Sequence, residues 1–337
     1  MSLLQSLGLE PKAKVCESAA TLFSTRLRQK LAAAEYAQCQ LLLTNATDEN
    51  RERMIYGASG SENAVGHAAK WVMNAPDSAM AHVLLGASMI AAGWEIRGDT
   101  YAKDVDDSAW LPFMAKLAGA EEPLLRAIAL DPRSAEAHGW LITAGMGRGQ
   151  DLAALRNIFD LAIARTPLHW ASHFAFFKVT TEKWCGSHKE MFKFVRNVSQ
   201  GAPRGHVLHC LIPAAYCDYA LAVRSEKGCK AISPALKHPK FADEVVRALY
   251  AWLNATSDNL QDKLLAASGG FASYGVNHFA VALYLCGAKK EARAVLSALS
   301  GQIDEMPWHW ISDGIREGLN PAFVYDRACR ELGVVIA

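Results

Sequence analysis

The sequence has no excess of either charge sign. Its 337 residues include 35 lysines and arginines against 34 aspartates and glutamates, which gives a formal net charge of +1 at pH 7. Proteins that bind nucleic acid or an anionic membrane through their overall field carry a clear positive excess or a basic patch. The composition therefore predicts no nucleic-acid partner and no membrane partner.

The sequence also lacks a long uninterrupted apolar run. The longest apolar stretch, Val83 to Trp94, contains glycine and serine and is shorter than the roughly 20 residues of a membrane-spanning helix. Residues 1–12 show no basic start followed by a long apolar segment, the pattern of a secretion signal. We therefore expect a soluble, cytoplasmic protein.

Sequence motifs of familiar chemistry are missing too. The eight cysteines never form a Cys-x-x-Cys pair, so we expect buried free thiols rather than a zinc or redox motif. The chain has no Gly-x-Ser-x-Gly, no His-Glu-x-x-His and no phosphate-binding glycine loop with its lysine. From these absences we expect a protein that is not an enzyme and that uses no cofactor and no metal.

What the sequence does contain is a repeat. A proline is followed six residues later by a histidine three times, in the pairs Pro76 and His82, Pro132 and His138, and Pro167 and His173. The second and third prolines are 35 residues apart and the first two are 56 apart, which indicates an insertion of about 21 residues in the first repeat. A period of this length, with almost no β-type alternation, predicts an all-α fold of stacked helical hairpins.

The expected organisation is one α-solenoid that covers the whole chain, with its weakest seam at residues 199–206. Its parts are an N-terminal helical cap over 1–60, repeats over 61–200 with an insertion at 95–112, and C-terminal repeats and a cap over 201–337. We expect the insertion to be a structured loop, because it is rich in acids, glycine and proline.

Two further helices are expected, one over about residues 48–56 and one over residues 113–130. One follows a cap at Thr47 or Asp48 and places Glu49, Glu52 and Arg53 toward solvent. The other is expected to run unbroken from residue 113 to residue 130 and to end before Asp131-Pro132.

Small and large residues in these hairpins follow the order of a tetratricopeptide repeat. In the unit that starts at Ala135 the matching positions are Leu141, Gly149, Ala154, Phe159, Ala162 and Pro167. The chain resembles the tetratricopeptide-like superfamily over about residues 61–300, and this resemblance implies a right-handed α–α superhelix. The segment Trp94-Glu-x-Arg97-Gly98, followed by Trp110-x-x-Phe113, is similar to an uncharacterised bacterial family of such proteins. Fold similarity alone implies no reaction.

In tetratricopeptide-like stacks the first helix of each hairpin lines a concave groove, and the resemblance implies such a groove here. The residues that resemble its exposed stripe are Val83, Ala87, Ile90, Gly139, Thr143, Met146, Phe174 and Lys178. Because the stripe is mostly apolar, we expect it to receive a protein or peptide partner with an apolar face, or to be covered by the 95–112 insertion. The first expected function is therefore that of a non-enzymatic protein-binding scaffold or adaptor.

A second hypothesis is a small-molecule sensor or enzyme with a pocket under the insertion. The residues that would build this pocket are Trp94, Glu95, Arg97, Tyr101 and Trp110, since a guanidinium beside an aromatic ring can clamp a carboxylate or phosphate. The favoured alternative is a latch in which Arg97 binds helix-terminal carbonyls or Glu95. The acids Asp104, Asp106 and Asp107 lack the spacing of a calcium loop and are expected in a solvated loop.

Histidines and cysteines offer two further candidate sites. His169 and His173 are four residues apart, a spacing that suits metal ligands on a helix, but the repeat position of His173 favours a packing role. His206, His209 and Cys210, with Cys217 or Asp218, could form a zinc site, although their spacing fits no common pattern. The aromatic cluster Trp308-His309-Trp310 either stacks on a ligand or, as we favour, plugs the end of a core.

Overall fold

The protein is all-α in a computed structural model that describes residues 10–16, 19–98, 106–267, 271–313 and 320–336. Its residues group into two compact units. One comprises Ala20–Phe194 and is called here the 20–194 unit; the other comprises Val195–Ala337 together with the chain up to Ala19 and is called the 195–337 unit. The prediction of one continuous solenoid stays a prediction.

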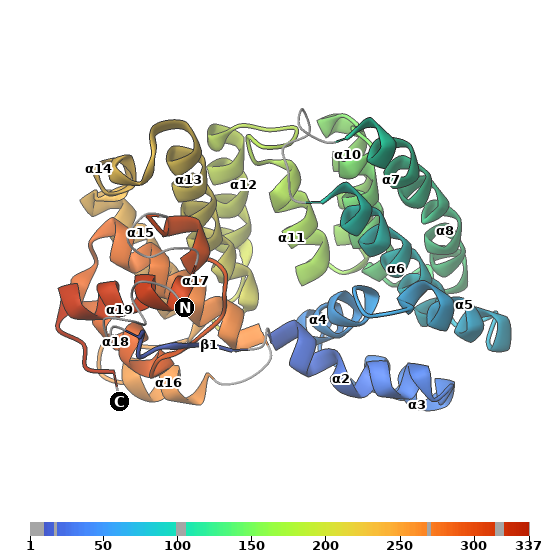
Figure 1. Ribbon diagram of the computed structural model, residues 1–337, viewed down its shortest axis with the longest axis horizontal. Helices are drawn as coiled ribbons and strands as arrows, with labels where there is room; N and C mark the ends of the chain where they lie inside the picture. Colours follow the sequence, from blue (N-terminus) through green and yellow to red (C-terminus); the bar gives the residue numbers. More distant parts are fainter. Residues whose placement is uncertain (1–9, 17–18, 99–105, 268–270, 314–319, 337) are drawn as a thin grey trace. The chain divides into compact units, whose positions relative to one another are not determined.

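The 20–194 unit is a succession of antiparallel helices (Figure 1). Helix α6 packs against α5 and α8, α9 packs against α8 and α10, and α11 packs against α9 and α10, as the hairpins of a helical repeat do. The elements are α2 (Ala19–Ala32), α3 (Tyr36–Thr44), α4 (Asp48–Ser59), α5 (Ala64–Asn74), α6 (Ala79–Arg97), α7 (Asp107–Gly119), α8 (Glu121–Leu130), α9 (Glu136–Gly147), α10 (Leu152–Arg165), α11 (Trp170–Val179) and α12 (His188–Gly201), the last of which crosses the boundary between the units.

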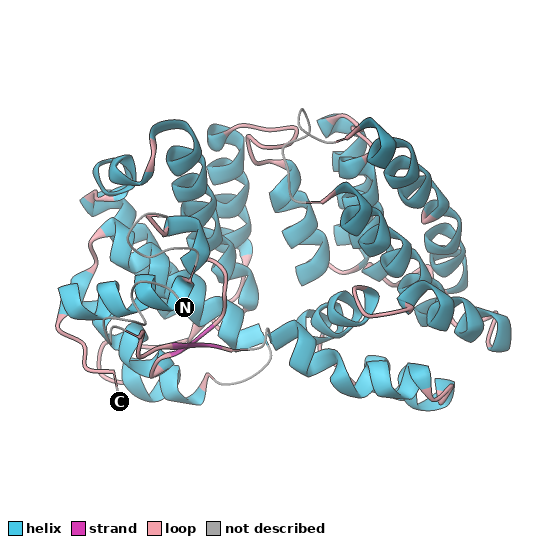
Figure 2. Cartoon of the chain, viewed as in Figure 1, coloured by secondary structure: helices cyan, strands magenta, loops and turns pink. Residues whose placement is uncertain are grey.

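The 195–337 unit is also helical, with one short pair of strands (Figure 2). Helix α17 packs against α13, α15 and α18, and β1 pairs in parallel with β2. The elements are β1 (Lys14–Val15), η2 (Val207–Cys210), α13 (Leu211–Lys227), η3 (Cys229–Ala231), α14 (Ile232–Leu236), α15 (Pro239–Trp252), α16 (Leu260–Ala266), α17 (Phe271–Cys286), α18 (Lys289–Leu299), β2 (Gln302–Ile303), η4 (Trp308–Ile311) and α19 (Pro321–Leu332).

The repeated prolines lie in the turns that precede α6, α9 and α11. The side chain two residues after each proline then accepts a hydrogen bond from a backbone N–H of the helix start, from the cap position of α6 and α11 and from one residue before the cap of α9. Ser78 accepts a hydrogen bond from the backbone N–H of Ala81, and Ser134 accepts one from that of Glu136. His169 takes the same place before α11 and accepts from Ser172. Side-chain caps satisfy backbone donors that a helix start leaves without partners.

The insertion differs from the expected loop. Helix α6 continues to Arg97, and α7 begins at Asp107, inside the segment expected to be irregular. The helix expected over residues 113–130 is in fact two helices, because α7 ends at Gly119 and α8 begins at Glu121. Pro123 in the first turn of α8 explains the break, since proline has no N–H to donate and clashes with the carbonyl four residues earlier.

Helix α6 is the only helix among the described residues that is long and apolar enough to cross a membrane by length and composition. More than half of its most apolar stretch is buried within the protein, and it packs against α4, α5, α7, α8 and α9. These contacts are those of a core helix, which passes the same length and composition test as a membrane span.

Close contact between α6 and α8 depends on a residue without a side chain. A Cβ atom added to Gly86 would lie 2.5 Å from Cγ of Leu124, and both residues are buried in the core. Leu124 also packs there with Leu84 and Leu117. Small residues at such crossings let two helices approach closely.

We expect Gly86→Ala to lower the free energy of unfolding by about 1–3 kcal/mol, because the added methyl group overpacks the contact with Leu124. Gly60→Ala is the matched control, since a Cβ atom at Gly60 meets nothing within 4 Å. Urea denaturation of both variants measures the difference. Equal stabilities for the two variants would show that α6 and α8 do not rely on this contact.

The histidine of the second repeat is buried in an unfavourable environment for charge. His138 is 3% exposed, and its Nδ1 has no hydrogen-bond partner among the described residues. Burial and the positive charge of Arg165 lower the pKa of His138 to about 4. The folded chain therefore holds this imidazole in its neutral form at pH values where the unfolded chain protonates it.

We predict that this site makes the fold less stable as the pH falls from about 6.5 to about 4, by about 2–3 kcal/mol in all, because only the unfolded chain takes up the proton in that range. His138→Gln should flatten that part of the dependence, whereas His67→Gln, at a less buried position on α5, should not. The measurement is the denaturation midpoint at a series of pH values. A wild-type slope that survives in the His138 variant would contradict the assignment.

Candidate functional site

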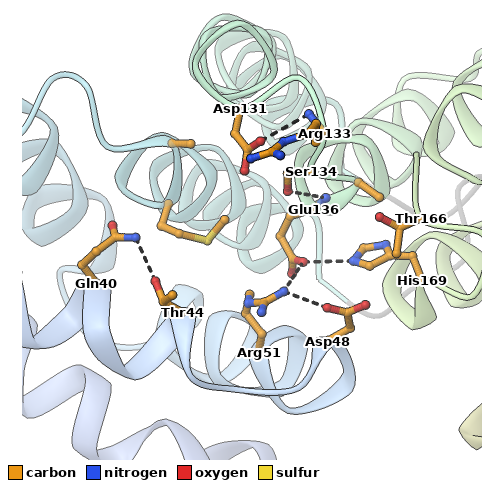
Figure 3. A pocket seen from close by; sticks show the side chains of 13 residues that line it. Gln40, Thr44, Asp48, Arg51, Asp131, Arg133, Ser134, Glu136, Thr166 and His169 are labelled. Atoms are coloured by element: carbon orange, nitrogen blue, oxygen red, sulfur yellow. Dashed lines mark hydrogen bonds and ion pairs between the residues drawn. The ribbon is translucent and has the colours of Figure 1, made fainter. Parts of the chain in front are cut away.

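A cavity of about 340 Å³ lies in the 20–194 unit, where the N-terminal ends of α6, α9 and α11 face α3 and α4 (Figure 3). Its lining is mostly polar and includes three carboxylates, two guanidinium groups and one imidazole. The residues are Gln40, Thr44, Asp48, Arg51, Ala79, Met80, Asp131, Arg133, Ser134, Ala135, Glu136, Thr166 and His169. A concave site with a few convergent polar groups is where a ligand is expected.

Glu136, the first residue of α9, is the most deeply buried charge of the cavity. Its side chain is 1% exposed, and its Oε2 lies 2.9 Å from Nε2 of His169 and 3.6 Å from Nη1 of Arg51. A carboxylate at a helix N-terminus also interacts favourably with the helix dipole. The position is therefore suited to a negative charge even though it is removed from water.

His169 joins the start of α11 to Glu136. Its Nδ1 accepts a hydrogen bond from the backbone N–H of Ser172 at 3.3 Å, and the Ser172 hydroxyl lies 2.8 Å from the same nitrogen. Because the cap needs Nδ1 as an acceptor, the proton of the neutral ring is on Nε2 and is donated to Glu136. One side chain therefore caps α11 and links it to α9.

Arg51 fixes the turn between α3 and α4. Its Nε donates to the carbonyl of Leu43 and its Nη2 to that of Ala46, at 2.8 and 2.9 Å. Its Nη1 donates to Oδ1 of Asp48 at 2.9 Å and faces Glu136. The planar fork of arginine satisfies several acceptors at once in this way, so Arg51 ties the α3–α4 turn to the start of α9.

The charges of the site change the pKa of its buried groups. Burial lowers the pKa of His169, but the hydrogen bond and charge of Glu136 raise it by more, so the net shift is upward. The pKa of Glu52 on α4 is raised because the effect of burial exceeds the attraction of Arg53 and Lys178. Burial raises the pKa of a carboxyl group and lowers that of an imidazole, whereas a nearby group of opposite charge shifts each pKa the other way.

The solvent-facing side predicted for α4 is wrong. The side chains of Glu52 and Arg53 are 12% and 16% exposed, and Glu49 is only half-exposed. The reason is that α4 packs against α6 and α11 and turns this side inward. Charged residues on a short helix look solvent-facing from the sequence, because the packing partner is far away in the chain.

Glu136, His169 and Ser172 form a hydrogen-bonded chain of acid, imidazole and hydroxyl, the set of groups found in nucleophilic catalysis. Here the hydroxyl cannot meet a substrate, because Ser172 is 0% exposed and lies within the first turn of α11. The same histidine nitrogen that would activate the hydroxyl already accepts from the backbone. This chain of residues therefore orders helix ends rather than activating a nucleophile.

The buried thiols are also poor nucleophiles. Burial raises the pKa of Cys39 and Cys329 to about 11 and that of Cys286 to about 12. Cys210 and Cys217 are buried as well, whereas Cys16, Cys185 and Cys229 are partly exposed. All eight are free, and the thiolate form that reacts is disfavoured where the thiol is buried.

One carboxylate oxygen of the site has no hydrogen-bond donor from the described residues. Oε1 of Glu136 is buried and has no hydrogen-bond partner among the described residues. An unpaired buried acceptor costs about 1–3 kcal/mol, more if charged, and buried polar groups normally have a partner. An unmatched carboxylate oxygen beside a cavity marks the position where a bound donor would be stabilised.

The apolar stripe predicted to line a groove is mostly inside the protein. Val83, Ala87, Ile90, Gly139 and Met146 are buried. The prediction that they form an exposed stripe is therefore wrong. Helix α4 packs on both α6 and α11, and α7, which begins inside the 95–112 insertion, packs on α6.

The other three stripe residues reach the surface to different extents. Thr143 and Phe174 are half-buried and Lys178 is exposed. The Lys178 ammonium lies 4.6 Å from the centre of the Phe174 ring, within the range of a cation–π contact. None of the three lines the cavity.

The insertion motif forms an aromatic contact at the C-terminal end of α6. The Trp94 ring lies 5.0 Å from that of Phe113 and 5.5 Å from that of Trp184. The Arg97 guanidinium stacks 5.3 Å from the Trp94 ring and donates to the carbonyl of Gly98. These contacts pack the end of α6 against Phe113 and Trp184, while Arg97 binds the carbonyl of the residue that follows it. A latch on the insertion stays a prediction.

The remaining residues of the motif lie apart from the cavity. Glu95 is exposed and Trp110 is 39% exposed, while Tyr101 and Asp104 lie outside the described residues. Asp106 caps α7 by accepting from the N–H of Ser108, and the two hydrogen bonds from Ser108 lower its pKa. The cavity is thus not the pocket that was expected under the insertion.

The histidine and cysteine candidates point to backbone partners. Nδ1 of His173 lies 2.9 Å from the carbonyl oxygen of His169. His206 caps η2, and Nε2 of His209 lies 3.0 Å from the carbonyl oxygen of Pro203. Within the part of the chain that the structure describes, no three histidine, cysteine or acidic side chains gather as a metal site would require.

The aromatic cluster near the C-terminus is part of a core. Trp308 is completely buried, and its Nε1 donates to Oδ1 of Asn277 at 2.7 Å. Its ring meets Tyr325 edge to face at 5.3 Å. The favoured interpretation of this cluster, a core plug, agrees with these contacts.

The central residues of the site, Arg51 and Glu136, were not singled out from the sequence, although a signal was present. Four residues after the repeated proline, the first and third copies have Met80 and Ala171, whereas the second has Glu136. A charge at a repeat position that is otherwise apolar is unusual, because burial disfavours charge. Two residues after the proline, Ser78 and Ser134 correspond to His169.

Comparison with known proteins adds no assignment: no protein-family model matches the chain, and no curated protein matches it. The resemblance to tetratricopeptide-like proteins therefore stays a prediction that the all-α fold accommodates.

We predict that Arg51→Ala lowers the free energy of unfolding by about 2–4 kcal/mol, because it leaves two carbonyls without their donor and removes the positive charge 3.6 Å from the buried Glu136. Arg126→Ala should cost at most about 0.5 kcal/mol, since its contact with Asp77 at 3.5 Å is between exposed side chains. Urea denaturation measures both variants. Similar losses for the two would show that Arg51 is no more than a surface residue.

Proposed function

We propose that this protein is a non-enzymatic binding protein whose 20–194 unit holds a compact polar partner in the cavity beside Glu136. One observation supports this above the others: a buried carboxylate, linked to His169 and Arg51, keeps one oxygen without a partner next to a cavity of about 340 Å³. Positions that combine unpaired polar atoms with an open volume are typical of binding sites.

Binding is favoured over catalysis by the accessibility of the groups. The hydroxyl of Ser172 is shielded from any substrate, and the histidine beside it serves as a helix cap. Asp48 and Arg51 are joined to each other, and Arg51 also holds two carbonyls of the chain. These groups are fixed in place by the fold, which suits recognition.

The partner is a small molecule or a single side chain of a peptide, because the cavity has the size of a small ligand site rather than a long groove. A role as a scaffold for an apolar helix is not favoured, because the faces of α6 and α9 that were expected to bind such a helix are buried. A protein partner stays part of the proposal only as the source of a polar side chain.

A substitution that fills the cavity tests the proposal. Thr44 lines the cavity and is exposed, so Thr44→Trp adds volume at the opening without disturbing the core. Gln38→Trp on the same helix, at an exposed position outside the cavity, is the matched control. A set of small amines, carboxylates and amino acids is screened against the full chain by ligand-observed NMR.

We expect the compounds that bind the unmodified protein to bind the Thr44 variant at least about tenfold more weakly, a loss of about 1.4 kcal/mol, and the Gln38 variant equally well. If every compound that binds retains its affinity for Thr44→Trp, the cavity is not the binding site and the proposal fails.

A further inference from the structure

We propose that the cavity recognises an alkylammonium group, that is, a compact ligand with a positively charged amine. This inference rests on the proposed binding function and adds the charge and chemistry of the ligand. It follows from an inventory of the donors and acceptors that face the cavity and of those that the protein itself already pairs.

The buried donors of the site are engaged, and the remaining guanidinium group of the lining, that of Arg133, belongs to an exposed residue. Arg51 donates through Nε and Nη2 to two carbonyls and through Nη1 to Asp48. His169 uses its Nε2 proton on Glu136, and its Nδ1 is an acceptor for Ser172. Neither residue offers a donor to an anionic ligand without breaking a contact that holds a helix end.

The acceptors are in excess. Oε1 of Glu136 has no partner among the described residues. Asp131 uses Oδ1 to accept from the backbone N–H of Arg133, and Asp48 uses Oδ1 to accept from Arg51; for the second oxygen of each, the described residues provide no hydrogen-bond donor. A ligand that supplies N–H donors therefore matches what the protein leaves unpaired.

The formal charges agree with this inventory. The lining has three carboxylates, Asp48, Asp131 and Glu136, against the guanidinium groups of Arg51 and Arg133, and His169 is neutral above its raised pKa. The excess is one negative charge. This negative charge attracts a cation more strongly in the cavity than it would in bulk water, because the protein interior screens charges less than water does.

Helix N-termini favour anions, and three of them face the cavity, so this opposing effect has to be weighed. The protein's own groups already occupy them: Glu136 stands at the start of α9, and Ser78 and His169 cap α6 and α11. The three helix N-termini therefore interact with side chains of the protein itself and attract an additional anion less strongly.

Three five-carbon compounds with different end groups test the inference on the full chain: 1,5-diaminopentane, 1,5-pentanediol and pentanedioate. Isothermal titration calorimetry at low salt should show binding of the diamine and at least about tenfold weaker binding of the other two. Glu136→Gln, which keeps the shape and removes the charge, should weaken the diamine at least about tenfold. Asp77→Asn, an exposed carboxylate outside the cavity, should leave it unchanged.

Two further measurements distinguish a free amine from a lysine side chain and provide a second variant in case the first does not fold. The peptide acetyl-Gly-Lys-Gly-amide reports whether a lysine side chain of a protein binds as well as the free diamine; binding of either supports the alkylammonium assignment. If Glu136→Gln does not fold, as its circular dichroism would show, Asp131→Asn takes its place with the same expected loss.

The two proposals fail in different ways. If pentanedioate binds, the diamine does not, and Thr44→Trp abolishes binding, then the cavity is a ligand site but the ammonium assignment is wrong. If none of the compounds binds in a way that depends on Thr44, the binding function itself is wrong. If the diamine binds but Glu136→Gln leaves its affinity unchanged, the ammonium lies elsewhere and the inference is overturned.

Discussion

The buried carboxylate of Glu136 is the interaction on which the N-terminal ends of the inner helices depend. It receives the Nε2 proton of His169 at the start of α11 and faces the Arg51 guanidinium at the start of α4. Taking these charges out of water costs several kcal/mol per ion unless each has partners of good geometry. Three elements far apart in the sequence are therefore linked by one charged group, and the removal of Glu136 would leave His169 Nε2 without its acceptor and Arg51 without one of its two carboxylate neighbours.

The same arrangement explains why the site is polar. An apolar residue in place of Glu136, as at Met80 and Ala171 in the other repeats, would need no partner from Arg51 or His169, whose other contacts are within the chain's turns and helix caps. A buried ion pair is often no more stabilising than a well-packed apolar contact, so the charged solution here adds little to stability by itself. What it adds is an electrostatic field set by fixed groups and an unmatched oxygen beside a cavity, and the proposed recognition of a charged ligand rests on these two features.

The three repeat copies show how one local pattern supports different roles. His82, His138 and His173 are all buried, and the first and third are hydrogen-bonding partners of carbonyls in the preceding turn. For His138, burial and the positive charge of Arg165 lower the pKa to about 4. The packing position is shared, but the protonation behaviour is set by what the neighbouring helices bring, such as Arg165 from α10.

The sequence by itself determined the all-α class, the turns before α6, α9 and α11, and the burial of the repeated histidines, because these follow from local signals: proline position, helix caps and period. It did not reveal that α4 turns Glu52 and Arg53 inward, that Pro123 divides the helix expected over residues 113–130, or that Glu136, His169 and Arg51 meet. Only the tertiary structure decided these features. Burial and charge pairing depend on residues more than 80 positions apart, such as Arg51 and Glu136, and the distance along the chain carries no information about which side chains share a cavity.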